Sequence, residues 1–260
     1  MGLTGAVGGV LAGLLGVGGG IVVVPVLELV LAAFGVDDRI RMHMAVATSL
    51  ATIVPTSMSS ARAHYRKLSI DMSIVRRWAP FVVAGTVAGT VIASFVSGRA
   101  LSGVFAVVAL LVAVNMLFQL SDRRAPAAAG EGVAILAVPF GIGGVSTLMG
   151  IGGGTLSVLA LKLLGRPIHL AVGTSALFGF FIAVPATLGY VFAGWGIGEL
   201  PPWSLGYVSV AGALLIAPTS VLTAPLGARI AHALSRGRLE MLFGLFLLVV
   251  SLRMFWTTFG

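Results

Sequence analysis

The sequence predicts an all-α protein that crosses a membrane several times and consists of two inverted repeats. The 260 residues are 58% hydrophobic and only 9% charged, whereas a soluble domain has about 25% charged residues. A glycine-rich motif in the first half returns in the second half. The basic residues also gather in few of the segments between apolar runs, which favours one arrangement of the chain in the bilayer.

The charge balance and the lack of cysteine exclude several other classes. A formal net charge of +8 would indicate nucleic-acid binding on a polar domain, but these charges lie in short gaps between apolar runs. The absence of cysteine removes disulfides, thiolate metal sites and thiol catalysis. We therefore expect membrane lipid around the protein and no nucleic acid, metal ion or cofactor.

The apolar runs divide into two kinds. Because a spanning helix needs about 20 residues, six runs are predicted as full spans: roughly 43–62, 78–97, 101–120, 169–194, 205–228 and 239–257. Two longer runs, 2–35 and 132–165, are interrupted by Gly16-Val-Gly-Gly-Gly20 and Gly150-Ile-Gly-Gly-Gly154. Consecutive glycines weaken a helix and allow the chain to turn, so each long run is predicted to break in its middle.

The two breaks belong to an internal repeat. The glycines of the first break coincide with those of the second at a shift of 134 residues, and His43-Met-Ala-Val-Ala-Thr-Ser49 coincides with His169-Leu-Ala-Val-Gly-Thr-Ser175 at a shift of 126. We therefore predict a first repeat over 1–120, a polar linker over 121–130 and a second repeat over 131–260.

The basic residues decide between two topologies. If each broken run crosses the membrane once, they divide almost evenly between the two sides. If each broken run enters and returns as a re-entrant hairpin, twelve fall on one side and three on the other, with Arg253 left near the end of the last helix. The twelve are Arg62, Arg66, Lys67, Arg76, Arg77, Arg123, Arg124, Lys162, Arg166, Arg229, Arg236 and Arg238, and the three are Arg39, Arg41 and Arg99. The positive-inside rule favours the second case.

Each repeat is then a glycine-broken re-entrant hairpin plus three transmembrane helices. The odd number of crossings inverts the second repeat relative to the first, places the linker in the cytoplasm and places both termini in the periplasm. Inverted repeats with interrupted helices are typical of secondary transporters, which bind substrate near the midplane.

The glycine breaks are the first candidate site. A helix that begins after such a break directs free N–H groups and the positive end of its dipole into the cavity, which favours an anion. The candidate residues are Gly18, Gly19, Gly20, Gly152, Gly153, Gly154 and Thr155. The alternative is that these glycines only allow close helix packing, as Gly85 and Gly89 would.

Hydroxyl and imidazole groups form a second set of candidates. Thr48, Ser49, Thr174 and Ser175 could donate hydrogen bonds to an oxyanion, or could instead bond their own helix backbone. His43 and His169 lie nearer the predicted membrane surfaces. They are candidates for gating or proton coupling because histidine titrates near neutral pH, and the competing interpretation is an interfacial histidine with satisfied hydrogen bonds.

Charged and aromatic residues within the apolar runs complete the candidates. Arg253 is predicted as an anion contact, whereas Glu28 and its repeat counterpart Lys162 could lie near a hairpin's exit, where the side chain reaches water. Four tryptophans close to predicted helix ends are interpreted as an interfacial aromatic belt: Trp78, Trp195, Trp203 and Trp256.

The repeated motifs resemble a known family. The stretch Gly8-Gly-Val-Leu-Ala-Gly-Leu-Leu-Gly-Val-Gly-Gly-Gly-Ile-Val-Val-Val-Pro-Val-Leu27, the His43 to Ser49 segment and their second copies are similar to the sulfite exporter TauE/SafE family. The resemblance covers nearly the whole chain. It implies an inner-membrane transporter of sulfur-containing anions such as sulfite, thiosulfate or organosulfonates. The second copy departs from the signature, because Leu159 stands where Pro25 would lie.

The sequence thus predicts a secondary transporter that exports a small sulfur-containing anion by alternating access. The alternative is an anion channel whose two glycine breaks form a filter. An intramembrane enzyme needs a nucleophile with a base or a metal cluster, and the sequence offers no such motif. The motifs leave open which anion is carried, the coupling ion and the oligomeric state.

Overall fold

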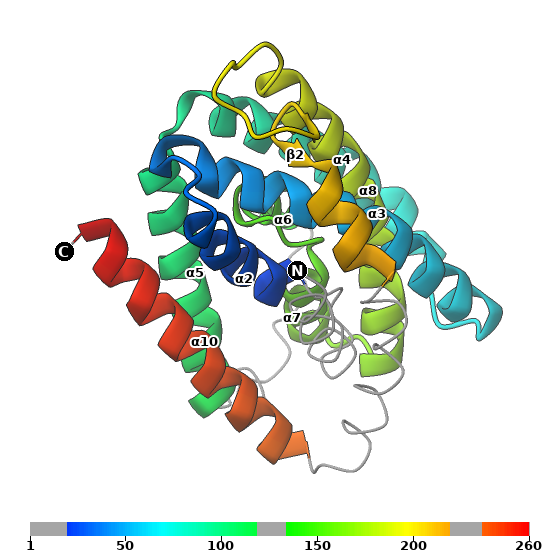
Figure 1. The fold of residues 1–260 in the computed structure, drawn as a ribbon. Helices are drawn as coiled ribbons and strands as arrows, with labels where there is room; N and C mark the ends of the chain where they lie inside the picture. Colours follow the sequence, from blue (N-terminus) through cyan, green and yellow to red (C-terminus); the bar gives the residue numbers. More distant parts are fainter. Residues whose placement is uncertain (1–19, 119–133, 219–235, 260) are drawn as a thin grey trace.

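The computed structural model of the chain describes residues 20–118, 134–218 and 236–259. These residues form long helices and one short β-hairpin (Figure 1). In chain order the elements are α2 (Gly20–Ala33), α3 (Asp38–Arg66), α4 (Met72–Phe95), α5 (Gly98–Phe118), α6 (Ala134–Met149), α7 (Gly154–Leu163), α8 (Ile168–Ala193), β1 (Ser204–Leu205), β2 (Val208–Ser209), a helical stretch over 210–218, and α10 (Arg236–Phe259).

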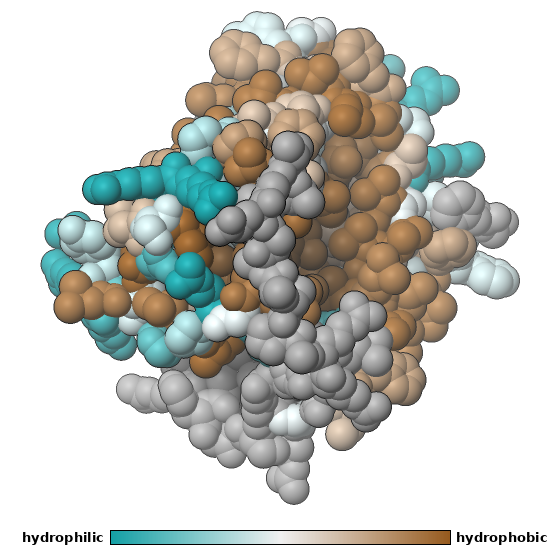
Figure 2. Space-filling model, turned by 180° about the vertical axis from the view of Figure 1, so that it is seen from behind, coloured by the Kyte–Doolittle hydropathy of each residue, from teal (hydrophilic) through white to brown (hydrophobic). Residues whose placement is uncertain are grey.

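Four of the described helices are long and apolar enough to cross a membrane. They are α4, α5, α8 and the stretch Met241–Thr258 of α10. The helices α2, α6 and α7 are also apolar but shorter. In the space-filling view, apolar side chains cover a broad area and polar side chains gather towards its left and right edges (Figure 2). Helices with apolar outer surfaces and polar ends identify a membrane protein.

Acidic residues begin two of the long helices. The carboxylate of Asp37 accepts a hydrogen bond of 2.8 Å from the amide of Arg39 at the start of α3. Asp71 does the same for α4, where its carboxylate accepts from the amides of Ser73 and Ile74. Such N-caps satisfy amides that have no partner within the helix.

Two close pairs of segments show that α3 and α8 run in opposite directions. Near the start of α3, the ring of His43 stacks on Tyr207, which follows α8 in the chain. Near the end of α3, His64 lies against Gly173 in the first turns of α8, where a Cβ on Gly173 would be 3.3 Å from that of His64. The segments that carry the repeated histidine motif are therefore antiparallel.

Glycines allow α4 and α6 to approach closely. A Cβ on Gly89 would lie 2.7 Å from the carbonyl oxygen of Gly144, and a Cβ on Gly85 would clash with the backbone of Phe140. Because Gly85 faces Phe140 and Gly89 faces Gly144, the two helices run in the same direction. Gly85 and Gly89 thus act in packing, as the small-xxx-small pattern predicts.

Two expectations about particular segments were wrong. The predicted span 205–228 does not begin as a helix, because residues 204–209 form the β1–β2 hairpin. Trp203 and Gly206 have positive φ angles there, of 64° and 54°, which a continuous helix does not allow. Trp78 also does not face outwards as a residue of an aromatic belt would, since it is buried and stacks on Phe178 of α8. The other three tryptophans, Trp195, Trp203 and Trp256, are exposed, and their place at the membrane interface remains a prediction.

Candidate anion site at the break between α6 and α7

The second glycine break separates α6 from α7, as the sequence predicts. The amide of Gly150 donates to the carbonyl oxygen of Thr147 and the amide of Ile151 to that of Ser146, at 3.3 and 3.0 Å. Gly150 has a φ of +70°. This pair of bonds with a left-handed glycine is the Schellman motif that ends helices. The helix α6 therefore ends at Met149 with a regular C-terminal motif.

The start of α7 leaves backbone donors without a side-chain cap. Its N-cap is Gly153, which has a φ of +67° and no side chain to accept from the first amides. The first helical bond runs from the amide of Ser157 to the carbonyl oxygen of Gly153, at 2.8 Å. The amides of Gly154, Thr155 and Leu156 precede this bond, so they lack partners within α7. Together with the helix dipole, they form an environment that favours an anion.

Buried hydroxyl groups lie on both sides of this helix start. Ser146, Thr155 and Ser157 each hold a buried side-chain oxygen that has no hydrogen-bond partner in the described part of the chain. Ser146 and Ser157 are completely inaccessible. The Oγ of Ser146 is 3.3 Å from the position that a Cβ on Gly153 would occupy. Buried polar groups normally have partners, and the described part of the chain supplies none for these three hydroxyls.

The sequence prediction included Thr155 but missed Ser146 and Ser157. Comparison of the repeats contains the signal that would have found them, because the first copy has Ala12 and Val23 at the corresponding positions. A hydroxyl that appears in only one copy of an apolar repeat stands out against its counterpart. The break in the second copy is therefore the more polar of the two.

The first copy meets the second at this break. A Cβ on Gly20 would lie 2.6 Å from the carbonyl oxygen of Gly150 and 3.0 Å from the Cα of Ile151, so the start of α2 rests directly on the break. Gly18 and Gly19 lie outside the described residues. The start of α2 at Gly20 thus contacts the break that precedes α7, although the two belong to different halves of the chain.

The break also packs against α3 and α8. A Cβ on Gly152 would lie 2.7 Å from a methyl group of Ile53 in α3 and 3.5 Å from the Cα of Gly179 in α8. Gly152 is buried. A side chain at this position would therefore require the Ile53 side chain to move.

The four predicted hydroxyl residues make different contacts. The Oγ of Ser49 donates to the carbonyl oxygen of Gly150 at 2.8 Å, so it holds the break itself. The Oγ of Ser175 donates to Val172 in its own helix at 2.8 Å. Thr48 and Thr174 instead accept backbone amides, from Ser209 at 3.0 Å and Asp71 at 2.9 Å. All four have protein partners in this conformation, and a substrate contact remains a prediction for each.

The two threonine contacts correspond to each other across the repeats. Thr48 lies in α3 and bonds the residue before the helical stretch 210–218, whereas Thr174 lies in α8 and bonds the N-cap of α4. Each threonine thus reaches from its own repeat to the start of a helix in the other repeat. The two contacts therefore join the two repeats at two places.

The two predicted histidines are in unlike surroundings. The Nε2 atom of His43 lies 3.2 Å from the carbonyl oxygen of Ala93 and 3.1 Å from that of Val96. Because both partners only accept, Nε2 carries the proton and bonds the end of α4. The Nδ1 atom of His43 is buried without a partner among the described residues. His169 is exposed, so the repeat does not preserve the environment of its histidine.

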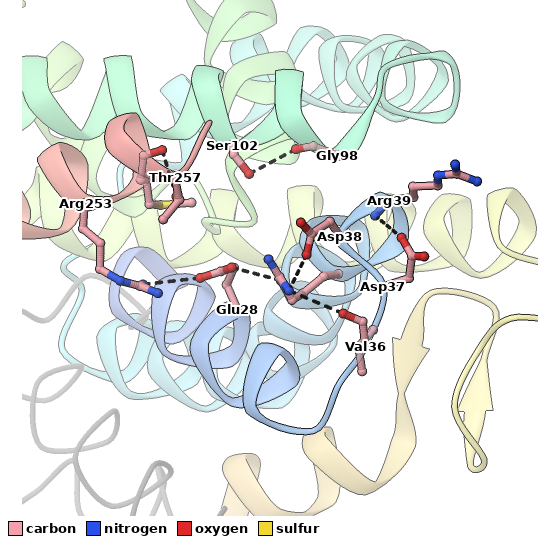
Figure 3. A network of polar contacts seen from close by, with 11 residues as sticks. Glu28, Val36, Asp37, Asp38, Arg39, Gly98, Ser102, Arg253 and Thr257 are labelled. Atoms are coloured by element: carbon pink, nitrogen blue, oxygen red, sulfur yellow. Dashed lines mark hydrogen bonds and ion pairs between the residues drawn. The ribbon is translucent and has the colours of Figure 1, made fainter. Parts of the chain in front are cut away.

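The predicted anion contact Arg253 belongs to an ion network (Figure 3). Its guanidinium lies 3.4 Å from one carboxylate oxygen of Glu28, and the guanidinium of Arg41 lies 3.0 Å from the other. Arg41 also pairs with Asp38 at 2.6 Å. Glu28 therefore links α2 to α3 and α10. The side chain of Arg253 is 41% exposed and holds Glu28 rather than the glycine break, so its role as an anion contact remains a prediction.

The apolar spanning helices and the buried helix start define a class of protein, a membrane protein with an internal polar site. The chain matches the model of the family described as "Sulfite exporter TauE/SafE" over residues 1–254. It belongs to this family and is a membrane transporter.

Relatives from distant organisms support this conclusion. The chain is 32% identical over 253 residues to a probable membrane transporter protein of Haemophilus influenzae, covering 97% of this chain and 96% of the relative. It is 27% identical over 263 residues to a probable membrane transporter protein of Methanocaldococcus jannaschii, covering 97% and 93%. A probable membrane transporter protein of Bacillus subtilis is 30% identical over 194 residues, covering 72% and 76%. No solved structure matches the chain.

Proposed function

We propose that this protein is a secondary transporter that exports a small sulfur-containing anion, such as sulfite, thiosulfate or an organosulfonate, across the inner membrane. The break between α6 and α7 is the substrate site. The observation that carries the proposal is the start of α7, which has no side-chain cap, beside the buried hydroxyl of Ser146, which has no partner among the described residues. The family description, which names sulfite, supports the choice of anion.

The chemistry of the break suits an oxyanion better than a cation or an apolar molecule. Backbone amides at a helix start and hydroxyl groups donate hydrogen bonds to oxygen atoms. Their partial charges stabilise a negative charge without placing a buried arginine or lysine in the membrane, which would be costly. A tetrahedral or pyramidal oxyanion can accept from several donors at once, from Gly154, Thr155 and Ser146.

The arrangement of the helices supports alternating access between inverted repeats. The antiparallel directions of α3 and α8 and the paired contacts of Thr48 and Thr174 are what an inverted repeat would produce. α6 runs in the direction of α4, and the residue Arg166 after α7 pairs at 3.4 Å with Asp71 at the start of α4. The chain thus turns back after the break, as a re-entrant hairpin would. We infer the same for the first copy, with both termini in the periplasm and residues 121–130 in the cytoplasm.

The membrane potential favours export as the direction of transport. Moving one elementary charge across a membrane changes its free energy by about 2.3 kcal/mol per 100 mV. An inside-negative potential therefore drives an anion outwards without a further energy source. Proton coupling through His43 is a second element of this proposal, because its buried Nδ1 is an available acceptor.

The proposal can be tested with purified protein in proteoliposomes. Labelled sulfite, thiosulfate, methanesulfonate and acetate would be compared in wild type and in Ser146→Ala. Loss of one donor to an anion should weaken apparent affinity by about 10-fold to 100-fold. The matched control is Ser94→Ala, since Ser94 donates within its own helix and is exposed. Equal transport by wild type and Ser146→Ala for every anion would place the substrate elsewhere.

The alternative function is an anion channel in which the two breaks form a filter. The direct contact between Gly20 and the break at Gly150 favours a channel, because a filter needs the two breaks next to each other. Single-channel recording separates the two functions. A carrier shows saturable flux that depends on the anion on the opposite side, whereas a channel shows a high unitary conductance.

A further inference from the structure

The outer face of α5 carries a groove that is separate from the glycine break. Its volume is about 630 Å³. It is lined by Arg99, Ala100, Gly103, Val104 and Val107 of α5 and by Thr258 of α10. These two helices lie side by side along one side of the molecule (Figure 1), and both are among the apolar helices that can span a membrane.

The walls of the groove are apolar and its floor is formed by small residues. Gly103 is buried, whereas Ala100 and Val107 are exposed. Gly103, Val104 and Val107 are neighbours in this lining. On a helix that spans a bilayer, an exposed apolar groove faces hydrocarbon rather than water.

One cation stands at the end of this groove. Arg99 is exposed at the first turn of α5, and no ion pair to it is found within residues 20–118, 134–218 and 236–259. The carboxylate of Asp38, on the neighbouring helix start, is held by Arg41 at 2.6 Å. A guanidinium at the end of a spanning helix lies at the depth of the lipid phosphates, with which it forms bidentate hydrogen bonds.

The length of the groove matches one leaflet. From Arg99 to Val108 the groove follows α5 over a length of about 14 Å, at a helix rise of about 1.5 Å per residue. Half of the hydrocarbon core of a bilayer is about 15 Å. A lipid whose phosphate contacts Arg99 would therefore place an acyl chain along the whole groove and end near the midplane.

We propose that this groove is a binding site for one anionic phospholipid, with its phosphate on Arg99 and an acyl chain between α5 and Thr258 of α10. The competing interpretation is a dimer, in which the same face of a second copy of the chain covers the groove. The charge argues for the lipid, because two copies related by a two-fold axis would bring their Arg99 side chains to a shared interface without a counter-charge.

The test is a titration of delipidated full-length protein with dioleoylphosphatidylglycerol, in which native mass spectrometry counts bound lipid. Wild type should bind one lipid. Arg99→Gln, which lacks the charge, should bind this lipid with an affinity about tenfold lower. Ala100→Leu fills the groove while keeping Arg99, and should also lose the lipid. The matched control is Arg76→Gln, an exposed arginine near the start of α4, which should bind as wild type does.

Any of three other outcomes would overturn the proposal. Equal binding by Arg99→Gln and wild type would remove the phosphate contact. Binding lost in Arg99→Gln but kept in Ala100→Leu would show a headgroup contact without an acyl chain in the groove. A change from oligomer to monomer in Ala100→Leu, with lipid binding unchanged, would show that a second copy covers this face. Circular dichroism before titration verifies that every variant is folded.

Discussion

The Oγ of Ser49 donates a hydrogen bond of 2.8 Å to the carbonyl oxygen of Gly150, across 101 residues of sequence. Both groups are buried. The bond joins α3 of the first repeat to the glycine break of the second. It fixes the orientation of the peptide group at which α6 ends, and with it the start of α7 four residues later.

Removing this bond should affect both stability and transport. In Ser49→Ala the carbonyl of Gly150 loses its side-chain donor, which costs about 0.6 kcal/mol and up to about 1.7 kcal/mol in membrane proteins. We expect a lower melting temperature and a higher apparent Km for the anion. The control is Ser57→Ala, because Ser57 is a buried serine of the same helix that donates to its own helix backbone. Identical behaviour of the two variants would show that the bond does not position the break.

Gly153 should not tolerate a side chain. Its φ of +67° costs an alanine about 1–2 kcal/mol, and the added Cβ would also clash with Ile182 and approach Ser146. Gly153→Ala should therefore lose transport as well as stability. Gly35→Ala is the matched control, since Gly35 has a φ of +73° but open space around its Cβ position. If Gly35→Ala and Gly153→Ala reduce transport equally, backbone strain alone accounts for the effect.

Glu28 should matter more for stability than Arg253. Replacing it by glutamine leaves Arg41 and Arg253 without the carboxylate that they share, and a charged hydrogen-bond partner contributes about 1.5–3 kcal/mol. Arg253→Gln loses only a contact of a 41% exposed side chain, worth about 0.2–1 kcal/mol. Thermal unfolding of both variants measures this difference. A stable Arg253→Gln variant that no longer transports would instead support a direct anion contact.

Acid should weaken the contact between Asp71 and Arg166. The hydroxyl of Ser73, the amide of Ile74 and the Arg166 guanidinium hold the pKa of Asp71 below its ordinary value of 3.8, although burial acts in the opposite direction. A lowered pKa stabilises the folded state at neutral pH, and this stabilisation is lost as the pH falls through the folded-state value. The expected window therefore lies below about pH 4.

Asp71→Asn isolates this effect because asparagine also caps helices. At pH 7 the variant should be less stable by up to about 1 kcal/mol, since Arg166 is half exposed. The difference in melting temperature from wild type should shrink as the pH falls from 5 to 3. A difference that stays constant over this range would contradict the assigned cause.

The predicted topology can be tested by labelling single cysteines, because the chain has none of its own. Leu68 is 88% exposed after α3, on the side of Asp71 and Gly173, and Gly198 is exposed after α8. An impermeant thiol reagent should modify Gly198→Cys in intact cells and leave Leu68→Cys unmodified until the cells are opened. Equal modification of both positions would refute the inverted arrangement.

The sequence by itself determined the class of protein and the place of the second break. Hydropathy and the shortage of charges depend on composition alone, and they required a membrane protein. The glycines at 150–154 allow the left-handed angles of Gly150 and Gly153 at which α6 ends and α7 begins, because glycine has no Cβ that opposes a positive φ. The repeated motifs were enough to identify the family.

Tertiary structure decided how the candidate residues are used. Ser49 and Ser175 occupy equivalent positions in the repeated motif, yet one reaches the break and the other bonds its own helix, because their neighbours differ. Trp78 was expected at an interface and lies in the core against Phe178. Arg253 is held by Glu28, 225 residues away. Hydrogen bonds and ion pairs depend on distances between segments that are remote in the sequence, and only the packed helices fix those distances.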